Sequence, residues 1–190
     1  MQGSPLPLPR AFYARDAATV ARALLGAVLT HHRSDGRILR GRVVETEAYV
    51  GTHDLACHTA RGRTPRTAVM FGPAGVAYVY FVYGMHHMFN VVTGGEGEGQ
   101  AVLIRAAAPL DGWSARLDGP GRLTLAMGIT LALSGADLGR APLHFTAGAA
   151  PEHVATTARI GVDYAGPWAE APLRFLDADS PHVSRRVDRR

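Results

Sequence analysis

The sequence predicts an α+β fold with an antiparallel sheet in a single domain. Hydrophobic residues make up 47% of the 190 residues, which is the composition of a globular protein long enough to bury roughly two-thirds of its unfolded surface. Most apolar segments have the length and pattern of strands, and Gly-rich turns separate them. We find no repeat or linker. We therefore expect one domain over 11–190, preceded by a flexible leader over 1–10 that carries three prolines.

The N-terminal third predicts a helix followed by a hairpin. The helix starts at Asp16, a good N-cap residue, and stops at Gly26. Strands over 28–33 and 37–49 form the hairpin, with Asp35-Gly36 as its turn. Strict alternation in the second arm places Val44, Thr46 and Ala48 on one face and Val43, Glu45, Glu47 and Tyr49 on the other.

The rest of the chain predicts further strands and a second helix. A loop rich in Gly, Pro and Arg covers 50–75, and Gly84 turns a strand over 76–83 into a strand over 85–92. A glycine-rich tip over 94–99 precedes a buried strand over 101–107. A loop around 118–122 leads into a helix over 123–133, and the segments 159–162 and 172–176 give short strands and turns.

The charged residues point towards a polyanionic partner. The formal charge is +4, and all twenty basic residues are arginine. Arginine suits phosphate through its bidentate fork, although many basic proteins bind nothing acidic. Without lysine no side-chain Schiff base can form, so amine-covalent chemistry would have to use the N-terminus.

Cysteine content and hydropathy indicate the compartment. Cys57 is the only cysteine, which excludes an internal disulfide and a multi-cysteine zinc site. There is no signal-peptide pattern and no apolar run near eighteen residues. We expect a cytoplasmic protein with no membrane partner.

Glu45 and Glu47 are the first candidates for chemistry. They lie two apart on a strand together with Tyr49, so their side chains share a face. A carboxylate near aromatic surface is desolvated and becomes more basic, which suits a general base that activates water. A solvated strand face would give the same Glu-x-Glu pattern, and the spacing does not say which glutamate works.

A metal site is the competing interpretation of the same region. Glu45, Glu47, His53, Asp54 and His58 are all metal-ligand types. They follow no standard ligand spacing, however, and strand neighbours seldom converge on one ion. We expect no metal and no cofactor.

The strand over 76–83 carries tyrosine on both of its faces. Tyr78 and Tyr80 share a face with Val76 and Val82, whereas Tyr83 has the opposite parity and begins the turn. Cross-strand packing accounts for most such aromatics. A large aromatic at an exposed hairpin tip also suits stacking between nucleic-acid bases.

The order of these segments resembles the alkyladenine (3-methyladenine, methylpurine) DNA glycosylase family. The likeness rests on Glu-Thr-Glu-Ala-Tyr over 45–49, Ala-Cys-His over 56–58 and Arg-Thr-Pro-Arg over 63–66. It continues with Tyr-x-Tyr-x-x-Tyr-Gly-Met over 78–85, Asn90, Leu-Ile-Arg over 103–105 and Arg-Ile-Gly-Val over 159–162. It covers nearly the whole chain. The resemblance implies a curved antiparallel sheet with surrounding helices and a protruding β-hairpin.

The resemblance also implies roles for single residues. Glu47 matches the general base, while Arg105 and the backbone carbonyl of Ile160 match groups that hold the attacking water. We therefore expect a mild effect from replacing Glu45. The other implied roles are base-pocket residues Tyr49, His58, Tyr80 and Asn90; DNA-intercalating residues Tyr83 and Met85; and DNA-backbone contacts Arg61, Arg63, Arg66 and Arg122.

The expected activity is hydrolysis of the N-glycosidic bond of a flipped-out purine. The substrate implied is double-stranded DNA with alkylated or deaminated purines, and the product is an abasic site without strand cleavage. We expect a monomer that associates with the nucleoid of a bacterium. Two alternatives remain open: a metal-dependent hydrolase built on the Glu/His/Asp cluster, and a non-catalytic nucleic-acid-binding module.

Overall fold

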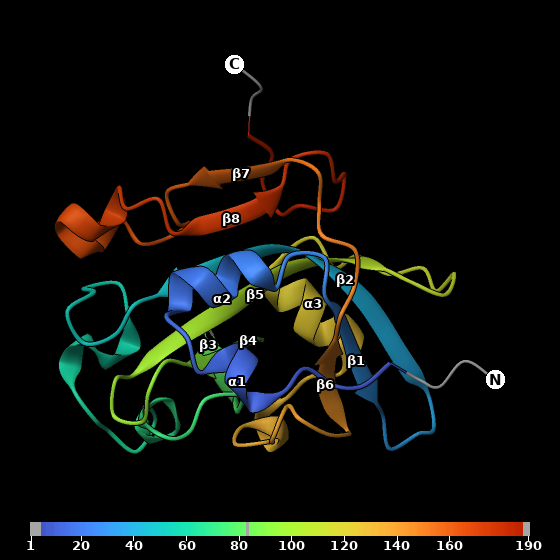
Figure 1. Ribbon diagram of the computed structural model, residues 1–190, viewed down its shortest axis with the longest axis horizontal. Helices are drawn as coiled ribbons and strands as arrows, with labels where there is room; N and C mark the ends of the chain where they lie inside the picture. The colour runs from blue at the N-terminus through green and yellow to red at the C-terminus, as the bar shows by residue number, and fades with distance from the viewer. Residues whose placement is uncertain (1–4, 83, 188–190) are drawn as a thin grey trace.

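One antiparallel sheet organises the molecule (Figure 1). The structure is a computed structural model that describes residues 5–82 and 84–187. Within this part of the chain, six strands run in the order β3-β4-β5-β2-β1-β6. In addition, β8 pairs with β2, and β7 pairs with β8. The predicted α+β class is confirmed. The strands are β1 (Val28–His32), β2 (Ile38–Tyr49), β3 (Ala77–Val82), β4 (His86–Thr93), β5 (Gln100–Pro109), β6 (Leu143–Thr146), β7 (Val154–Thr157) and β8 (Arg174–Asp177).

Strand β2 is the centre of the sheet. It pairs with β5 along one edge, while its other edge pairs first with β1 and then with β8. Its hairpin with β1 is confirmed: Arg33 and Arg37 are joined by a backbone hydrogen bond across the turn, where Gly36 has a φ of 82°. Such a positive φ favours glycine.

The alternation predicted for β2 is wrong at its middle. A register shift interrupts the β2–β5 pairing between Val43 and Glu45, so two residues face one there. Val43 consequently packs in the main core together with Ala48, whereas Val44 packs in a separate cluster with Leu176. Glu45 and Glu47 still share a side, because both contact Arg105.

In the part of the chain that the structure describes, three α-helices and four 3-10 helices flank the sheet. Helix α2 begins as predicted, with the Asp16 side chain accepting a hydrogen bond from the Thr19 N–H. The helix expected over 123–133 starts earlier and stops earlier, because Pro120 opens α3 and Gly128, in the left-handed region, ends it. The helices are α1 (Arg10–Tyr13), α2 (Ala17–Ala23), α3 (Pro120–Met127), η1 (His58–Arg61), η2 (Ala68–Phe71), η3 (Leu131–Leu133) and η4 (Asp163–Ala169).

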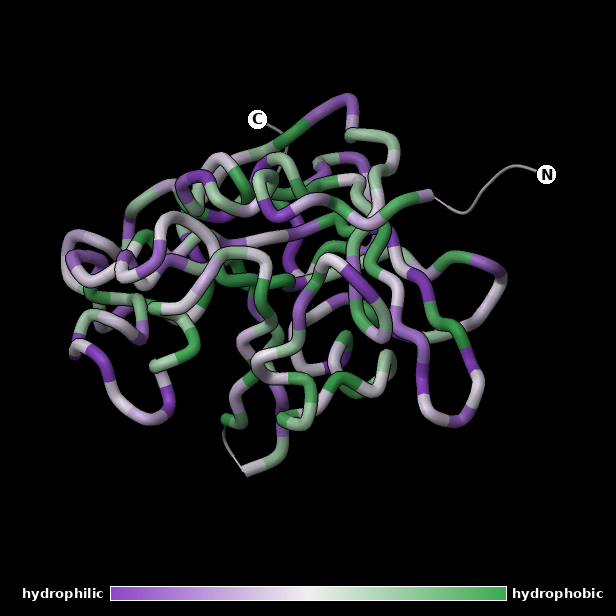
Figure 2. The backbone as a smooth tube through the Cα atoms, turned by 60° about the horizontal axis from the view of Figure 1, so that its bottom comes forward, coloured by the Kyte–Doolittle hydropathy of each residue, from purple (hydrophilic) through white to green (hydrophobic). Residues whose placement is uncertain are grey.

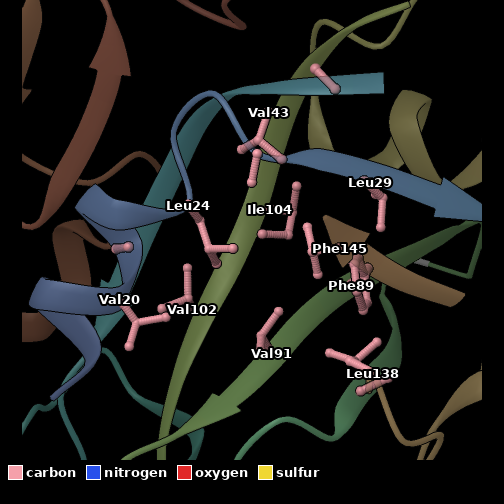
Figure 3. Close-up of a cluster of buried hydrophobic side chains, with 14 of the residues drawn as sticks. Val20, Leu24, Leu29, Val43, Phe89, Val91, Val102, Ile104, Leu138 and Phe145 are labelled. Atoms are coloured by element: carbon pink, nitrogen blue, oxygen red, sulfur yellow. The ribbon is translucent and has the colours of Figure 1, made fainter. Parts of the chain in front are cut away.

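The main hydrophobic core lies between the sheet and the three α-helices that have been described. Figure 3 shows Val20 of α2 and Leu24, which follows the helix, pointing towards Val102 and Ile104 of β5. In the same core, the rings of Phe89 of β4 and Phe145 of β6 stack in nearly parallel planes. No helix in the described part of the chain has the length and apolar character needed to span a bilayer.

Residues 7–10, expected to belong to a flexible leader, contact the domain. Pro7 forms a bridge with Thr146, and the Leu8 N–H donates to the Phe145 carbonyl of β6. The sequence pattern did not predict β6, because four residues are too few for a clear period. Pro7 and Leu8 therefore extend the β6 edge.

Strands β3 and β4 form the predicted hairpin, with Tyr78 opposite Asn90. This hairpin extends from the body of the molecule at the bottom of Figure 2. Tyr83, which we expected at its tip, lies outside the described residues. Gly84 follows with a φ of 67°, and Met85 is 68% exposed.

Candidate active site

A pocket of about 290 Å³ opens between the β3–β4 hairpin, the end of β2 and the loop after β7. Tyr78, Tyr80 and Val82 all line it, which confirms that these alternate residues of β3 share a face. The remaining lining includes Tyr49, Cys57, His58, Arg66, Asn90, Arg105 and Ile160. Residues from distant parts of the sequence therefore meet around one concave site.

Glu47 lies directly behind this pocket and is fully buried. The Ile160 N–H donates to Oε1 at 2.8 Å, while the Tyr49 hydroxyl and Arg105 Nη1 donate to Oε2 at 3.0 and 3.3 Å. All three donors come from pocket-lining residues. The structure thus holds an acceptor-only carboxylate at the pocket wall with both oxygens oriented.

Burial and the Arg105–Glu47 ion pair determine which side chains at the pocket wall are charged. Burial, followed by the nearby Glu47 charge, raises the pKa of Tyr49 well above its usual value, so its hydroxyl stays a donor. Burial opposes the charge of Arg105, but Glu47 and Glu45 keep its pKa above the ordinary value. Arg105 is therefore a permanent cation beside the carboxylate.

Aromatic rings form the body of the pocket. The His58 ring lies edge-on to Tyr80, with centroids 4.5 Å apart, and its Nδ1 is 2.9 Å from the Tyr78 hydroxyl. Burial, and then the positive charge of Arg66, lowers the pKa of His58 to about 4. His58 is therefore a neutral imidazole at neutral pH. Tyr78 was not among the expected pocket residues, although its shared face with Tyr80 could have indicated it.

Asn90 and Arg66 complete the pocket. Asn90 is buried, and its Nδ2 donates to the Tyr78 carbonyl at 3.2 Å. Arg66, expected to contact the DNA backbone, has its guanidinium 5.0 Å above the centre of the Tyr80 ring. That position puts a flat cation at the aromatic wall.

A buried ion pair supports the site from one side. Arg159 donates to both oxygens of Asp54, at 2.5 and 2.9 Å, and both side chains are fully buried. The same guanidinium lies 4.8 Å above the Tyr49 ring and donates to the Ala48 carbonyl. Because Ile160 follows Arg159, this pair fixes the turn whose N–H reaches Glu47. Short strands and turns were expected over 159–162 and 172–176; the first segment contains no strand, and the second leads into β8.

The other expected DNA contacts lie on the surface around the pocket. Arg61, at the end of η1, and Arg63 are exposed, as is Met85. Arg122 is half-exposed and lies 3.2 Å from Asp118. The contacts of these side chains with DNA stay predictions.

The metal interpretation finds no geometric support in residues 5–82 and 84–187. No group of three or more His, Cys, Asp or Glu side chains in this part of the chain is placed to hold an ion. Asp54 is paired with Arg159, and Glu45 is paired with two arginines. The ligand types identified in the sequence are therefore committed to separate partners.

Comparison with known proteins supplies the family. Residues 11–181 match the model of the methylpurine-DNA glycosylase family. A Myxococcus xanthus protein named "Putative 3-methyladenine DNA glycosylase" is 57% identical over 94% of this chain and 93% of its own length. Identically named proteins are 50% identical in Legionella pneumophila strain Lens, over 94% and 98%, and 52% identical in Anaeromyxobacter dehalogenans strain 2CP-C, over 95% and 87%. The chain belongs to the methylpurine-DNA glycosylase family and is a DNA glycosylase, a hydrolase of the N-glycosidic bond.

Proposed function

We propose that this glycosylase flips an alkylated or deaminated purine out of duplex DNA and hydrolyses its N-glycosidic bond with water activated by Glu47. One observation carries the proposal: a buried carboxylate with three oriented donors stands behind an aromatic pocket. The product is an abasic site in an intact strand.

The concave shape of the site supports flipping. A base inside the duplex hides its sugar carbon, so an enzyme that attacks there extrudes the nucleotide, at a cost of a few kcal/mol. A volume of about 290 Å³ lies at the small end of ligand pockets, which are roughly 300–1,000 Å³. It therefore suits one flat base better than an extended ligand.

Glu47 takes the proton of the attacking water. As the water oxygen bonds to C1′, its proton passes to the carboxylate, and the electrons of the C1′–N bond leave with the base. The charge of Arg105 and the donors on Glu47 hold the carboxylate in one orientation for this step. The carbonyl of Ile160 remains our expected second contact for the water.

The pocket walls favour a flat, electron-poor base. Tyr49 and Tyr80 line the pocket with aromatic rings, and a ring face that Arg159 or Arg66 does not occupy is worth roughly 0.5–2 kcal/mol towards a cation. Alkylation at a ring nitrogen makes the purine cationic and so increases this attraction. Asn90, which is buried and lines the pocket, is the filter against the amino group of normal guanine that the family resemblance implies.

One assay tests the proposed function and its alternatives. A duplex with a single 7-methylguanine is incubated with the protein, with and without a chelator, and free base and alkali-labile strand are measured. We expect base release in both conditions and strand scission only after alkali, because the chain has no lysine for lyase chemistry. Release abolished by the chelator would favour a metal-dependent hydrolase, and binding without release a non-catalytic module.

Substrate range should follow the charge of the leaving base. Cationic bases such as 3-methyladenine and 7-methylguanine need no acid, because departure neutralises them. A neutral base such as hypoxanthine needs a proton, and His58, with a pKa of about 4, does not carry one at neutral pH. We therefore expect excision of hypoxanthine to be slower and to fall more steeply with rising pH. Single-turnover rates for both bases between about pH 6 and pH 9 check this, and parallel profiles would contradict it.

Tyr83 is expected to fill the gap left by the flipped nucleotide, a role implied by the family resemblance. Tyr83→Ala should weaken capture of the flipped state, and the loss should be larger on duplex than on single-stranded substrate, where no stack is broken. Rates on both substrates measure this, and Phe81→Ala, at another exposed aromatic residue of the same hairpin, is the control. Equal losses on the two substrates would mean that Tyr83 only packs the hairpin.

A further inference from the structure

Glu45 is buried as deeply as Glu47, but apart from Arg105 its hydrogen-bond partners are not residues that line the substrate pocket. Its Oε1 accepts hydrogen bonds from Arg105 Nε at 3.0 Å, Arg174 Nε at 2.8 Å and the Ser184 hydroxyl at 2.7 Å. Its Oε2 accepts from the Ser184 N–H at 2.5 Å. Both oxygens are thus occupied by protein donors, so any contribution of Glu45 to base excision passes through these partners.

Residues 182–187, here called the C-terminal segment, close this side of the site. Arg174 Nη2 donates to the Arg185 carbonyl at 2.5 Å, and Val183 packs in the cluster that contains Val44 and Leu176. The family match ends at residue 181, so the segment lies beyond it. Ser184 reaches back across 139 positions of sequence to Glu45.

Arg105 connects the two glutamates. Its Nε donates to Glu45, its Nη1 to Glu47 at 3.3 Å, and its Nη2 to the Ser184 hydroxyl oxygen at 3.5 Å. The guanidinium is planar and rigid, so fixing Nε and Nη2 fixes the direction of Nη1. The orientation of the cation that meets Glu47 is therefore set by Glu45 and Ser184.

We propose that Ser184, Glu45 and Arg174 are positioning residues that hold Arg105 against Glu47, which makes the C-terminal segment part of the machinery for base release. The inference rests on the proposed role of Glu47. Misplacing a catalytic group by about 1 Å can cost roughly 10²-fold in rate even when the change lies away from the chemistry. A hydroxyl that orients Arg105 is therefore expected to affect the chemical step and to leave substrate affinity unchanged.

The structure also alters our expectation for Glu45. A neutral amide at this position would leave Arg105 and Arg174 facing each other without the carboxylate between them, and one of its two groups would be a donor facing donors. We now expect Glu45→Gln to slow base release as well as to destabilise the fold, where the sequence alone predicted a mild effect.

Serine substitutions in the full chain separate positioning from stability. Ser184→Ala removes the hydroxyl, and Ser184→Thr retains one. Ser180→Ala is the matched control, because Ser180 lies close by in sequence and its hydroxyl oxygen accepts the His182 N–H and does not contact Glu45 or Arg105 in the part of the chain that the structure describes. Each variant is measured for melting temperature, affinity for a 7-methylguanine duplex and single-turnover rate of base release.

We expect Ser184→Ala to lower the single-turnover rate roughly tenfold with unchanged affinity, Ser184→Thr to restore the rate, and Ser180→Ala to leave it unchanged. The inference is overturned if Ser184→Ala matches an active wild type, or if both alanine variants slow in proportion to their loss of stability. A wild type that releases no base overturns the proposed function itself, which is a distinct result.

Discussion

Glu47→Gln should abolish base release while leaving lesion binding nearly intact. The amide cannot accept the proton of the attacking water, and loss of a general base costs about 10²–10⁴ in rate. The chain has no lysine that could attack in place of the water. Binding should survive because the aromatic faces and Asn90, which contact the base in our proposal, are unchanged.

The geometry makes this variant interpretable. Glu47 receives the Ile160 N–H on one oxygen and the Tyr49 hydroxyl and Arg105 on the other. Glutamine keeps one oxygen acceptor and replaces the other oxygen by an amide NH₂ group, which is a donor. Of the three groups that contact Glu47, only the Tyr49 hydroxyl can accept this hydrogen bond, by rotating its own O–H away. A moderate fall in melting temperature is therefore expected, and single-turnover rates are compared well below it.

Glu96→Gln, the same change at an exposed position, is the control and should behave like the wild type. If Glu47→Gln kept its rate, or lost binding as strongly as rate, Glu47 would be a structural carboxylate. If Glu45→Gln were the more crippling of the two, the assignment of the general base to Glu47 would be wrong. The rates of the three variants therefore assign the base within the Glu-x-Glu pair.

The local patterns of the sequence predicted the strands that build the pocket. Alternation along β3 placed Tyr78 and Tyr80 on one face, and both line the pocket. The same reasoning failed on β2, because the register shift near Val43 depends on the pairing with β5 and leaves no mark in the period. Similarly, Gly128 ended α3 where the apolar pattern continued.

Long-range partners are what the sequence could not predict. Asp54 and Arg159, which form a buried ion pair, are 105 positions apart in the sequence. From its residue type alone, Asp54 was considered as a possible metal ligand. Nothing near Ser184 in the sequence suggests that it reaches Glu45. Arg66 belongs to an arginine-rich loop for which contacts with DNA phosphates were expected. Its guanidinium group nevertheless lies over the Tyr80 ring. Pairing across the fold decides the role of such residues.

The largest loss of stability is expected from Asp54→Asn. The carboxylate holds Arg159 through two hydrogen bonds in a region where both side chains are fully buried. Removing one partner leaves a buried guanidinium without its counter-charge, which typically costs roughly 3–5 kcal/mol of unfolding free energy. Asp54 also accepts the Ala56 N–H, so the loop after β2 loses an anchor. For a chain of this size the loss corresponds to a melting temperature lowered by roughly 6–20 °C.

Thermal unfolding of Asp54→Asn, Asp35→Asn and the double variant Asp54→Asn/Arg159→Met tests whether burial is the cause. Asp35 pairs with Arg37 on the surface, where solvent screens the charges, so Asp35→Asn should barely move the melting temperature. The double variant removes both buried charges and should recover part of the stability. Its rate of base release should nevertheless stay below that of the wild type. The Ile160 turn and the Tyr49 ring lose their contact with the guanidinium group that positions them. An Asp54→Asn protein as stable as the wild type would show that the pair does not hold the fold, and a double variant with full activity would show that it does not hold the site.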